Sequence, residues 1–259
     1  FNMISPLANI SPKARIGSNV TIEAFATIYE DVEIGDNCHI HPNAVIYPDT
    51  VIGSGCRIFP GAVIGVVNQD LKYKGEKSKT IIGNNTTIRE YATIHKGTAD
   101  RMLTKVGDNC LIMCYTHLGH DCWLGNNVII ANNGSLAGHI TVEDFVVIEG
   151  VVAAQQFVTI GAHSFVAGAS LVRKSIPPYI RVAREPLQFI GVNTIGLSRR
   201  GFDKEAIKQI EDIYRIIFVR GHNISNALEI VESEMPDTNF RREIVEFIRN
   251  QPDGIVRGI

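Results

Sequence analysis

Residues 16–40 read IGSNVTIEAFATIYEDVEIGDNCHI, with isoleucine at every sixth position. A period of six matches neither the 3.6-residue repeat of a helix nor the two-residue repeat of one strand. It is typical of short strands joined by tight corners, one of each per hexad. The stripe of Ile, Leu and Val extends over residues 4–172, and only four positions interrupt it: Asp70, Glu76, Asp100 and Ala154.

A second set of positions, two residues before each stripe residue, also predicts inward side chains, because alternate residues of a strand share a face. Burying each large stripe residue contributes roughly 1.5–3 kcal/mol as an upper bound. The sequence therefore predicts an all-β parallel β-helix, a prism with three hexads, or about eighteen residues, in each coil. The second set is small or apolar and includes Ala26, Val32, Ala44, Ala62, Val128, Cys38, Cys56, Cys110 and Cys122.

Charged residues replace the stripe in two places, which predicts loops that leave the prism at about residues 65–80 and 95–105. Loops on a rigid scaffold often carry binding residues. Beyond Val172 the stripe ends, and we expect a β-helix over residues 1–190 and a C-terminal helical domain over 191–259.

Helical spacing supports this C-terminal prediction. Asp203 is a predicted N-cap and Gly221 a predicted stop for the first helix. Residues 223–234 and 239–250 predict two more helices.

Composition excludes several function classes. The 259 residues are 45% hydrophobic and 20% charged, with a formal charge of −2, so general affinity for nucleic acid or membranes is not expected. No apolar run approaches the roughly 18 residues of a membrane span, and no leader pattern opens the chain. Five cysteines without framework spacing suit a reducing compartment, so we expect a cytoplasmic protein.

Residues 114–122, CYTHLGHDC, suggest either a zinc site or a catalytic base with its carboxylate. Cys122 belongs to the predicted core, where a free cysteine behaves as a small hydrophobe. It could not share a metal with surface histidines. We therefore expect no metal and no cofactor.

A step of eighteen residues stacks His120, Gly138 and Gln156 on one edge of the prism, with His139 beside them. Leu118 points inward, so His117 should point outward. A neutral imidazole next to a carboxylate can deprotonate an alcohol, and a glycine N–H can stabilise the oxyanion of an attacked thioester. The alternative is that these histidines only cover exposed corners.

Motifs along nearly the whole chain resemble the UDP-N-acetylglucosamine O-acyltransferase family of lipid A biosynthesis. The resemblance implies left-handed coiling, a homotrimer with active sites between prisms, and acyl carrier protein as donor. The implied reaction moves an (R)-3-hydroxyacyl chain to the 3-hydroxyl of UDP-N-acetylglucosamine. The matching motifs are NQDLKY (68–73), IREYATIHKGT (88–98), HLGHDC (117–122), LAGHITV (136–142), QQF (155–157), IPPY (176–179) and GVNTIGLSRRGF (191–202).

The resemblance also implies roles for individual residues. His120 matches the general base, Asp121 its orienting carboxylate and Gly138 the oxyanion-stabilising backbone. Gly168 matches the position that sets acyl length, where a glycine predicts a chain of roughly 14 carbons or more, although a simple tight corner is an equal alternative. Residues matching contacts to the sugar nucleotide, the acyl donor or the carrier are Gln69, Asp70, Lys72, His117, His139, Gln156, Asn193, Arg199 and Arg200.

Three other classes of protein account for the sequence less well. A sugar-nucleotide N-acyltransferase of the same superfamily would carry a uridine-binding domain before its prism, for which a stripe starting at Ile4 leaves no room. A γ-class carbonic anhydrase would need three histidine ligands, and His95, His117 and His120 fit that spacing poorly. A structural or ice-binding β-helix would have flat repetitive faces rather than charged loops. Within the favoured class, a 3-hydroxyl and a 3-amino acceptor are both compatible with the predicted base.

Overall fold

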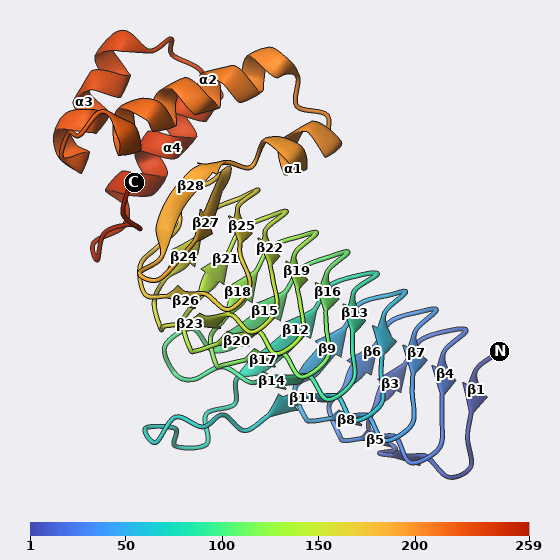
Figure 1. The fold of residues 1–259 in the computed structure, drawn as a ribbon. Coiled ribbons are helices and arrows are strands. Elements are labelled where there is room, and N and C mark those ends of the chain that lie inside the picture. Colours follow the sequence, from blue (N-terminus) through green and yellow to red (C-terminus); the bar gives the residue numbers. More distant parts are fainter. Residues whose placement is uncertain (259) are drawn as a thin grey trace.

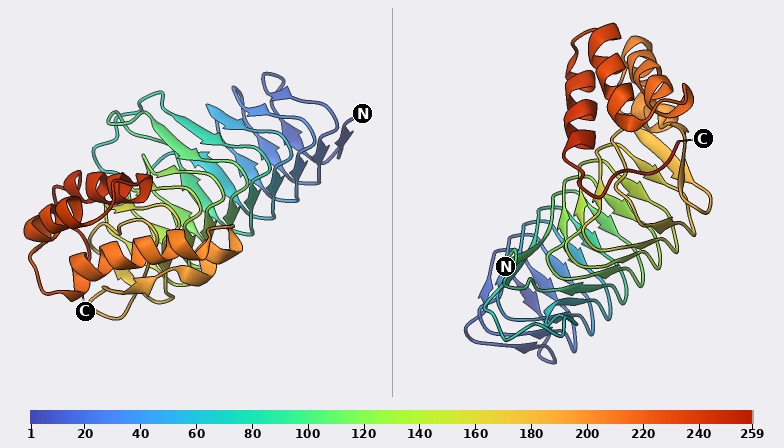
Figure 2. Two further views of the ribbon diagram at one scale, coloured as in Figure 1. Left: turned by 90° about the horizontal axis from the view of Figure 1, so that it is seen from above. Right: turned by 90° about the vertical axis from the view of Figure 1, so that its left-hand side faces the viewer.

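The computed structural model describes residues 1–258 and contains three sheets that wind into a long prism, capped by helices at one end (Figures 1 and 2). The strands pair in parallel except for one antiparallel hairpin at the C-terminal end of the largest sheet. Paired strands are offset by about one coil; for example, Thr21 pairs with His39 and Leu118 with Leu136. The predicted hexad prism is confirmed.

The strands of each sheet follow in hydrogen-bonded order. The 11-stranded sheet contains β1 (Met3–Ile4), β4 (Thr21–Ile22), β7 (His39–Ile40), β10 (Arg57–Ile58), β13 (Thr87–Ile88), β16 (Leu111–Ile112), β19 (Ile129–Ile130), β22 (Val147–Ile148), β25 (Phe165–Val166), β27 (Ile180–Ala183) and β28 (Gln188–Val192). The nine-stranded sheet contains β2 (Asn9–Ile10), β5 (Thr27–Ile28), β8 (Val45–Ile46), β11 (Val63–Val66), β14 (Thr93–His95), β17 (His117–Leu118), β20 (Ser135–Leu136), β23 (Ala153–Ala154) and β26 (Leu171–Val172). The eight-stranded sheet contains β24 (Thr159–Ile160), β21 (Thr141–Val142), β18 (Trp123–Leu124), β15 (Leu103–Val106), β12 (Lys79–Ile82), β9 (Thr50–Ile52), β6 (Glu33–Ile34) and β3 (Arg15–Ile16).

Stripe residues and the small inward residues form one continuous core, in which Ile22 and Ile112 are at most 1% exposed. The four cysteines predicted to lie in this core are buried, as expected. The hydrophobic stripe residues are incompletely buried only at the start of the chain, where Ile4 is 46% exposed. Ile4 belongs to the first coil, so no earlier coil covers it.

The corners between strands explain why Asn, Asp and Gly recur between the hydrophobic positions. From Asn19 onward, most corners have one residue with a positive φ, a conformation that asparagine and aspartate tolerate better than most side chains. Asp121 (φ 59°) and His139 (φ 63°) occupy two of these corner positions. Such strained backbone positions often coincide with functional sites.

Two segments leave the prism, residues 67–78 between β11 and β12 and residues 96–102 between β14 and β15. The first projects from the prism as the extended loop in Figure 1. The predicted ranges, about 65–80 and 95–105, contain both segments.

The helices are α1 (Thr194–Arg199), α2 (Lys204–Tyr214), α3 (Ile224–Glu234) and α4 (Asn239–Arg249), with a π-helical segment η1 (Arg215–Val219) extending α2. Asp203 caps α2 by accepting a hydrogen bond from the Ala206 N–H, and Gly221 follows η1 with φ 79°, as predicted. The hairpin β27–β28 and helix α1 were not predicted. A domain boundary at residue 190 stays a prediction, because β28 spans it.

Within the described residues, none of the helices combines the length and the apolar character that a membrane crossing requires.

Candidate active site

A pocket of about 540 Å³ lies on the edge between the nine-stranded and eight-stranded sheets, beneath the first loop. Most of the residues predicted from the eighteen-residue step face it. Its lining residues are Gln69, Asp70, Leu71, Lys72, His95, His117, Gly119, His120, Ser135, Ala137, Gly138 and Gln156.

His120 and Asp121 form a hydrogen-bonded pair at this edge. The His120 Nδ1 lies 2.9 Å from Asp121 Oδ2, which leaves Nε2 as the nitrogen that faces Gly138 and the pocket. The His120 side chain is only 9% exposed and that of Asp121 is fully buried. An exposed corner was expected; instead, the second loop covers the pair while His120 still lines the pocket.

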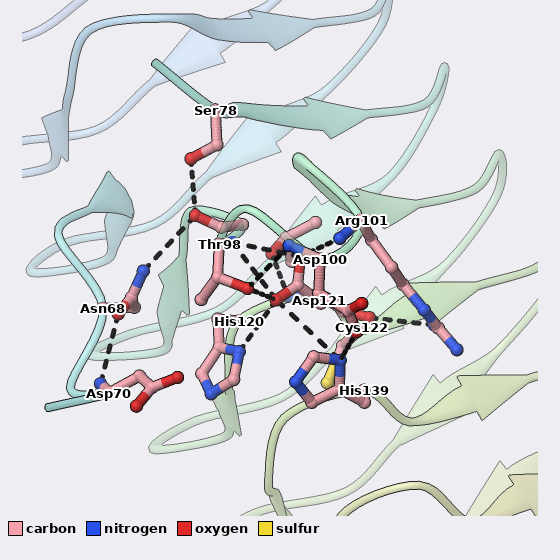
Figure 3. A network of polar contacts seen from close by, with 12 residues as sticks. Asn68, Asp70, Ser78, Thr98, Asp100, Arg101, His120, Asp121, Cys122 and His139 are labelled. Atoms are coloured by element: carbon pink, nitrogen blue, oxygen red, sulfur yellow. Dashed lines mark hydrogen bonds and ion pairs between the residues drawn. The ribbon is translucent and has the colours of Figure 1, made fainter. Parts of the chain in front are cut away.

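The second loop holds the Asp121 carboxylate through several hydrogen bonds (Figure 3). The Thr98 N–H lies 3.0 Å from Oδ1 and the Thr98 hydroxyl 2.5 Å from Oδ2. The Arg101 N–H also contacts Oδ1, and the Asp121 N–H donates to the hydroxyl of Thr104. With the bond from His120, the lone pairs of the carboxylate are occupied, so Asp121 acts as a fixed acceptor for the imidazole.

Gly138 lies directly against the ring of His120. A Cβ at position 138 would lie 2.5 Å from Cε1 and 2.6 Å from Nε2, distances that real side chains do not adopt. Within the described chain the Gly138 N–H donates no hydrogen bond, so it is free for a ligand. An unpartnered amide N–H and the free imidazole nitrogen thus belong to two residues that pack against each other in one pocket.

His139 extends the polar edge by one residue. Its ring packs edge-on against His120, with centroids 4.8 Å apart, and stacks on Phe157 at 4.5 Å. Its Nδ1 lies 2.9 Å from Asp100 Oδ2 but makes no well-directed hydrogen bond. His120 and His139 therefore orient each other by packing, and Asp121 holds His120.

Burial lowers the pKa of three histidines at this edge. The pKa of His95 falls to about 4, chiefly because its ring is removed from water and also because His117 and His120 are nearby. Burial likewise lowers the pKa of His117 and of His139. These imidazoles are neutral at pH 7, which avoids repulsion among adjacent cations.

The two loops are joined to each other and place three predicted residues over the pocket. The Asn68 amide donates to the carbonyls of Lys96 and Gly97, at 3.4 and 3.3 Å, and Ser78 donates to Gly97 (Figure 3). Asp70 accepts from the Lys72 N–H. Gln69, Asp70 and Lys72 therefore face the same space as His120.

Four predicted residues lie elsewhere in the chain. Asn193 caps α1 and donates to the His163 carbonyl, Arg199 is exposed, and Arg200 lies over the Phe145 ring at 5.5 Å. Burial lowers the pKa of Arg200. Gly168 lies on the edge between the 11-stranded and nine-stranded sheets, where its N–H donates to the Glu149 carboxylate at 2.9 Å. One chain therefore does not bring these four residues to the pocket.

The structure argues against both zinc hypotheses. Cys122 is fully buried, and its thiol donates to the Ala137 carbonyl at 2.9 Å. Among residues 1–258, His95, His117 and His120 do not converge as a set of three ligands. One nitrogen each of His120 and His139 and one oxygen of Asp121 do converge within 4.8 Å, but the oxygens of Asp121 are already occupied by hydrogen bonds.

Sequence reasoning missed the residues that hold the His120–Asp121 pair, above all Thr98 and Arg101. Both lie in the second loop, where no period relates them to the prism. Thr98 ends the motif IREYATIHKGT, and this was the one available signal.

Two known protein families match this sequence. The family described as "Bacterial transferase hexapeptide (six repeats)" matches residues 13–48, 31–65 and 103–138, and "Udp N-acetylglucosamine O-acyltransferase; Domain 2" matches residues 176–259. Fold and site together define a hexapeptide-repeat transferase, and the prism is the left-handed parallel β-helix of that class.

Relatives similar over the full length refine the assignment. The chain is 42% identical to the acyl-[acyl-carrier-protein]–UDP-N-acetylglucosamine O-acyltransferase of Pseudomonas aeruginosa strain LESB58, over 95% of this chain and 97% of that protein. It superimposes on the LpxA structure from Bacteroides fragilis with a TM-score of 0.97 and 47% identity, covering 98% and 100% of the two chains. The structure of the Arabidopsis UDP-N-acetylglucosamine acyltransferase superimposes with a TM-score of 0.85 and 32% sequence identity, covering 99% of each of the two chains. The chain belongs to the acyl-[acyl-carrier-protein]–UDP-N-acetylglucosamine O-acyltransferase family.

Proposed function

We propose that this protein transfers an (R)-3-hydroxyacyl chain from acyl carrier protein to the 3-hydroxyl of UDP-N-acetylglucosamine, the first step of lipid A biosynthesis. The observation that carries this proposal is that Gly138 packs against the His120 ring, so that the free Nε2 and the unpartnered Gly138 N–H belong to one pocket. Full-length similarity to enzymes of that name supports the choice of substrates.

In the proposed mechanism, His120 Nε2 removes the proton of the sugar hydroxyl while the oxygen attacks the thioester carbonyl. The resulting tetrahedral oxyanion accepts a hydrogen bond from the Gly138 N–H. When the intermediate collapses, the carrier thiolate leaves and takes the proton from His120. Asp121 holds the imidazole in the tautomer with Nδ1–H, so that Nε2 starts as the acceptor.

The remaining polar residues would bind the substrates. Gln69, Asp70 and Lys72 extend from the first loop over the pocket, and His117, His139 and Gln156 follow the prism edge. We assign these six residues to the sugar nucleotide and the acyl donor.

We propose that the protein is a homotrimer with each site shared between two chains. Arg199, Arg200 and Asn193 contact the nucleotide or the carrier in this proposal, yet they lie outside the pocket of their own chain, so a neighbour would supply them. A neighbouring chain would also bury a column of exposed apolar side chains on one edge of the prism. In this column Tyr91 and Tyr115 stack with ring centroids 5.4 Å apart, and Val151 is 63% exposed.

Hybrid complementation tests the sharing of sites. A His120→Ala chain and an Arg200→Ala chain should each be weakly active alone and recover activity when co-assembled, because some hybrid sites contain neither substitution. Equally low activity of the hybrids would contradict a shared site, and a monomer in sedimentation would contradict the assembly.

Gly168 lies on the same edge as this apolar column, so in the assembly it would face the acyl chain. We propose that the absence of a side chain there admits chains of roughly 14 carbons or more. Gly168→Met should shift the preference among 3-hydroxyacyl carrier proteins towards shorter chains, about fourfold for each buried methylene lost. An unchanged preference would leave Gly168 as a corner only.

A cytoplasmic location fits the five free cysteines, which a reducing compartment maintains.

One assay distinguishes the proposed reaction from its nearest alternatives. Purified protein is incubated with UDP-N-acetylglucosamine or its 3-amino analogue, and with 3-hydroxyacyl carrier protein or acetyl-coenzyme A. We expect transfer to the 3-hydroxyl from the carrier-bound donor. Transfer to the amine alone would indicate the amino acceptor, and transfer from acetyl-coenzyme A alone would contradict the proposed donor.

A further inference from the structure

A second cluster of histidines with a carboxylate lies far from the pocket, near the N-terminal end of the prism. Glu23, His39 and His41 each direct one ligand atom to a common point, and these three atoms lie within 4.8 Å of one another. The eighteen-residue coil places Glu23 directly beside His41, and His39 and His41 lie on either side of the inward-pointing Ile40.

The distances are those of a compact donor set. Glu23 Oε1 lies 2.6 Å from His39 Nε2 and 3.2 Å from His41 Nδ1. In a tetrahedral zinc site with bonds of about 2.0–2.1 Å, neighbouring ligand atoms are roughly 3.3 Å apart. The distance from Glu23 Oε1 to His41 Nδ1 already matches this spacing. A small rotation of the half-exposed Glu23 side chain would bring its distance to His39 Nε2 to the same value.

The packing holds both imidazoles in place. The rings of His39 and His41 stack with centroids 3.9 Å apart, and Phe59 stacks on the other face of His41 at 4.5 Å. Rings fixed in this way lose little freedom when they bind an ion.

Charge favours an ion over a simple pair of salt bridges. Two protonated rings stacked at 3.9 Å would repel each other, so at most one of them can be charged in a salt bridge to Glu23. A single divalent ion satisfies both nitrogens and the carboxylate at once.

We propose that Glu23, His39 and His41 form a binding site for a divalent transition metal such as Zn²⁺. The side chains are 38%, 38% and 21% exposed in a single chain, which leaves room for a further ligand. The bound ion would join strands β4 and β7, next to the first coils, where Ile4 and Ile10 are incompletely buried. Its role is thus structural and separate from acyl transfer.

The test uses metal-free full-length protein, titrated with Zn²⁺ by calorimetry and with Co²⁺ by visible absorption. Wild type should bind one Zn²⁺ per chain with a micromolar or tighter Kd, and its melting temperature should rise with Zn²⁺. His39→Ala, His41→Ala and Glu23→Gln should each weaken binding at least tenfold and reduce the melting shift.

Two matched controls complete the design. His139→Ala removes a ligand from the other histidine cluster, and His222→Ala removes an exposed histidine of the helical region; both should bind as wild type does. Absence of saturable binding by wild type would overturn the proposal. So would binding that survives His39→Ala and His41→Ala but is lost in His139→Ala. Circular dichroism at 25 °C confirms that each variant is folded before titration.

Discussion

The Cα of Gly138 lies so close to the His120 ring that any side chain at position 138 would overlap Cε1 and Nε2. The residue proposed to take the substrate proton therefore packs directly against the residue whose amide is proposed to bind the oxyanion. Glycine has two tasks here: it leaves room for the imidazole, and it exposes its own N–H. Both follow from the eighteen-residue coil, which stacks position 138 on position 120.

Gly138→Ala should lower kcat by at least about 10²-fold, because the new methyl group displaces the imidazole or turns the amide away. The Kd for UDP-N-acetylglucosamine should change little, since the loss occurs in the transition state. Steady-state kinetics with calorimetric binding measure both quantities. Gly221→Ala is the matched control: its φ of 79° costs stability on the order of 1 kcal/mol, but activity should persist. Full activity of Gly138→Ala would refute the proposed contact.

Thr98 should prove to be a positioning residue. Thr98→Val removes the hydroxyl that donates to Asp121 Oδ2 while retaining size and backbone, so kcat should fall roughly tenfold with little change in KM. Thr98→Ser keeps the hydroxyl and should restore most of the rate. Equal activity of the valine and serine variants would show that this hydrogen bond does not support catalysis.

The core stripe should determine stability. Ile112 is completely buried, so Ile112→Ala should reduce the free energy of unfolding by about 2–5 kcal/mol. Ile195, 60% exposed, provides the comparison, and Ile195→Ala should change stability by no more than about 0.5 kcal/mol. Urea unfolding followed by circular dichroism measures both; similar losses would contradict the assigned burial.

Stability should fall with acidity through His163, whose pKa burial lowers to about 4. The unfolded chain takes up a proton below about pH 6.5 while the folded ring stays neutral, so stability is full above pH 6.5 and is lost progressively as the pH falls towards 4. His163→Phe should remove the share of this loss that His163 causes, while buried His95 keeps its own share. Phenylalanine suits the site, because His163 stacks between Phe145 and Tyr179 and Phe occupies equivalent corners at positive φ. Identical pH profiles for wild type and variant would exclude His163 as a cause.

The sequence was informative wherever the hexad repeats one burial requirement. The coils, the inward cysteines and the proximity of His120 to Gly138 all follow from counting in sixes and eighteens. Counting could not show that the second loop would bury Asp121, because loop residues such as Thr98 have no periodic relation to the prism. The hairpin β27–β28 and the short helix α1 were missed for the same reason. The cluster of Glu23, His39 and His41 was within reach, since position 41 is one coil after position 23.

The rate of a single turnover tests the central proposal most directly. Enzyme in excess over 3-hydroxyacyl carrier protein is mixed with UDP-N-acetylglucosamine, and ester formation is followed for wild type, His120→Ala and His222→Ala. Loss of the positioned base should slow His120→Ala by about 10²–10⁴-fold, with nucleotide binding preserved and His222→Ala unaffected. An undiminished single-turnover rate in His120→Ala would contradict the account.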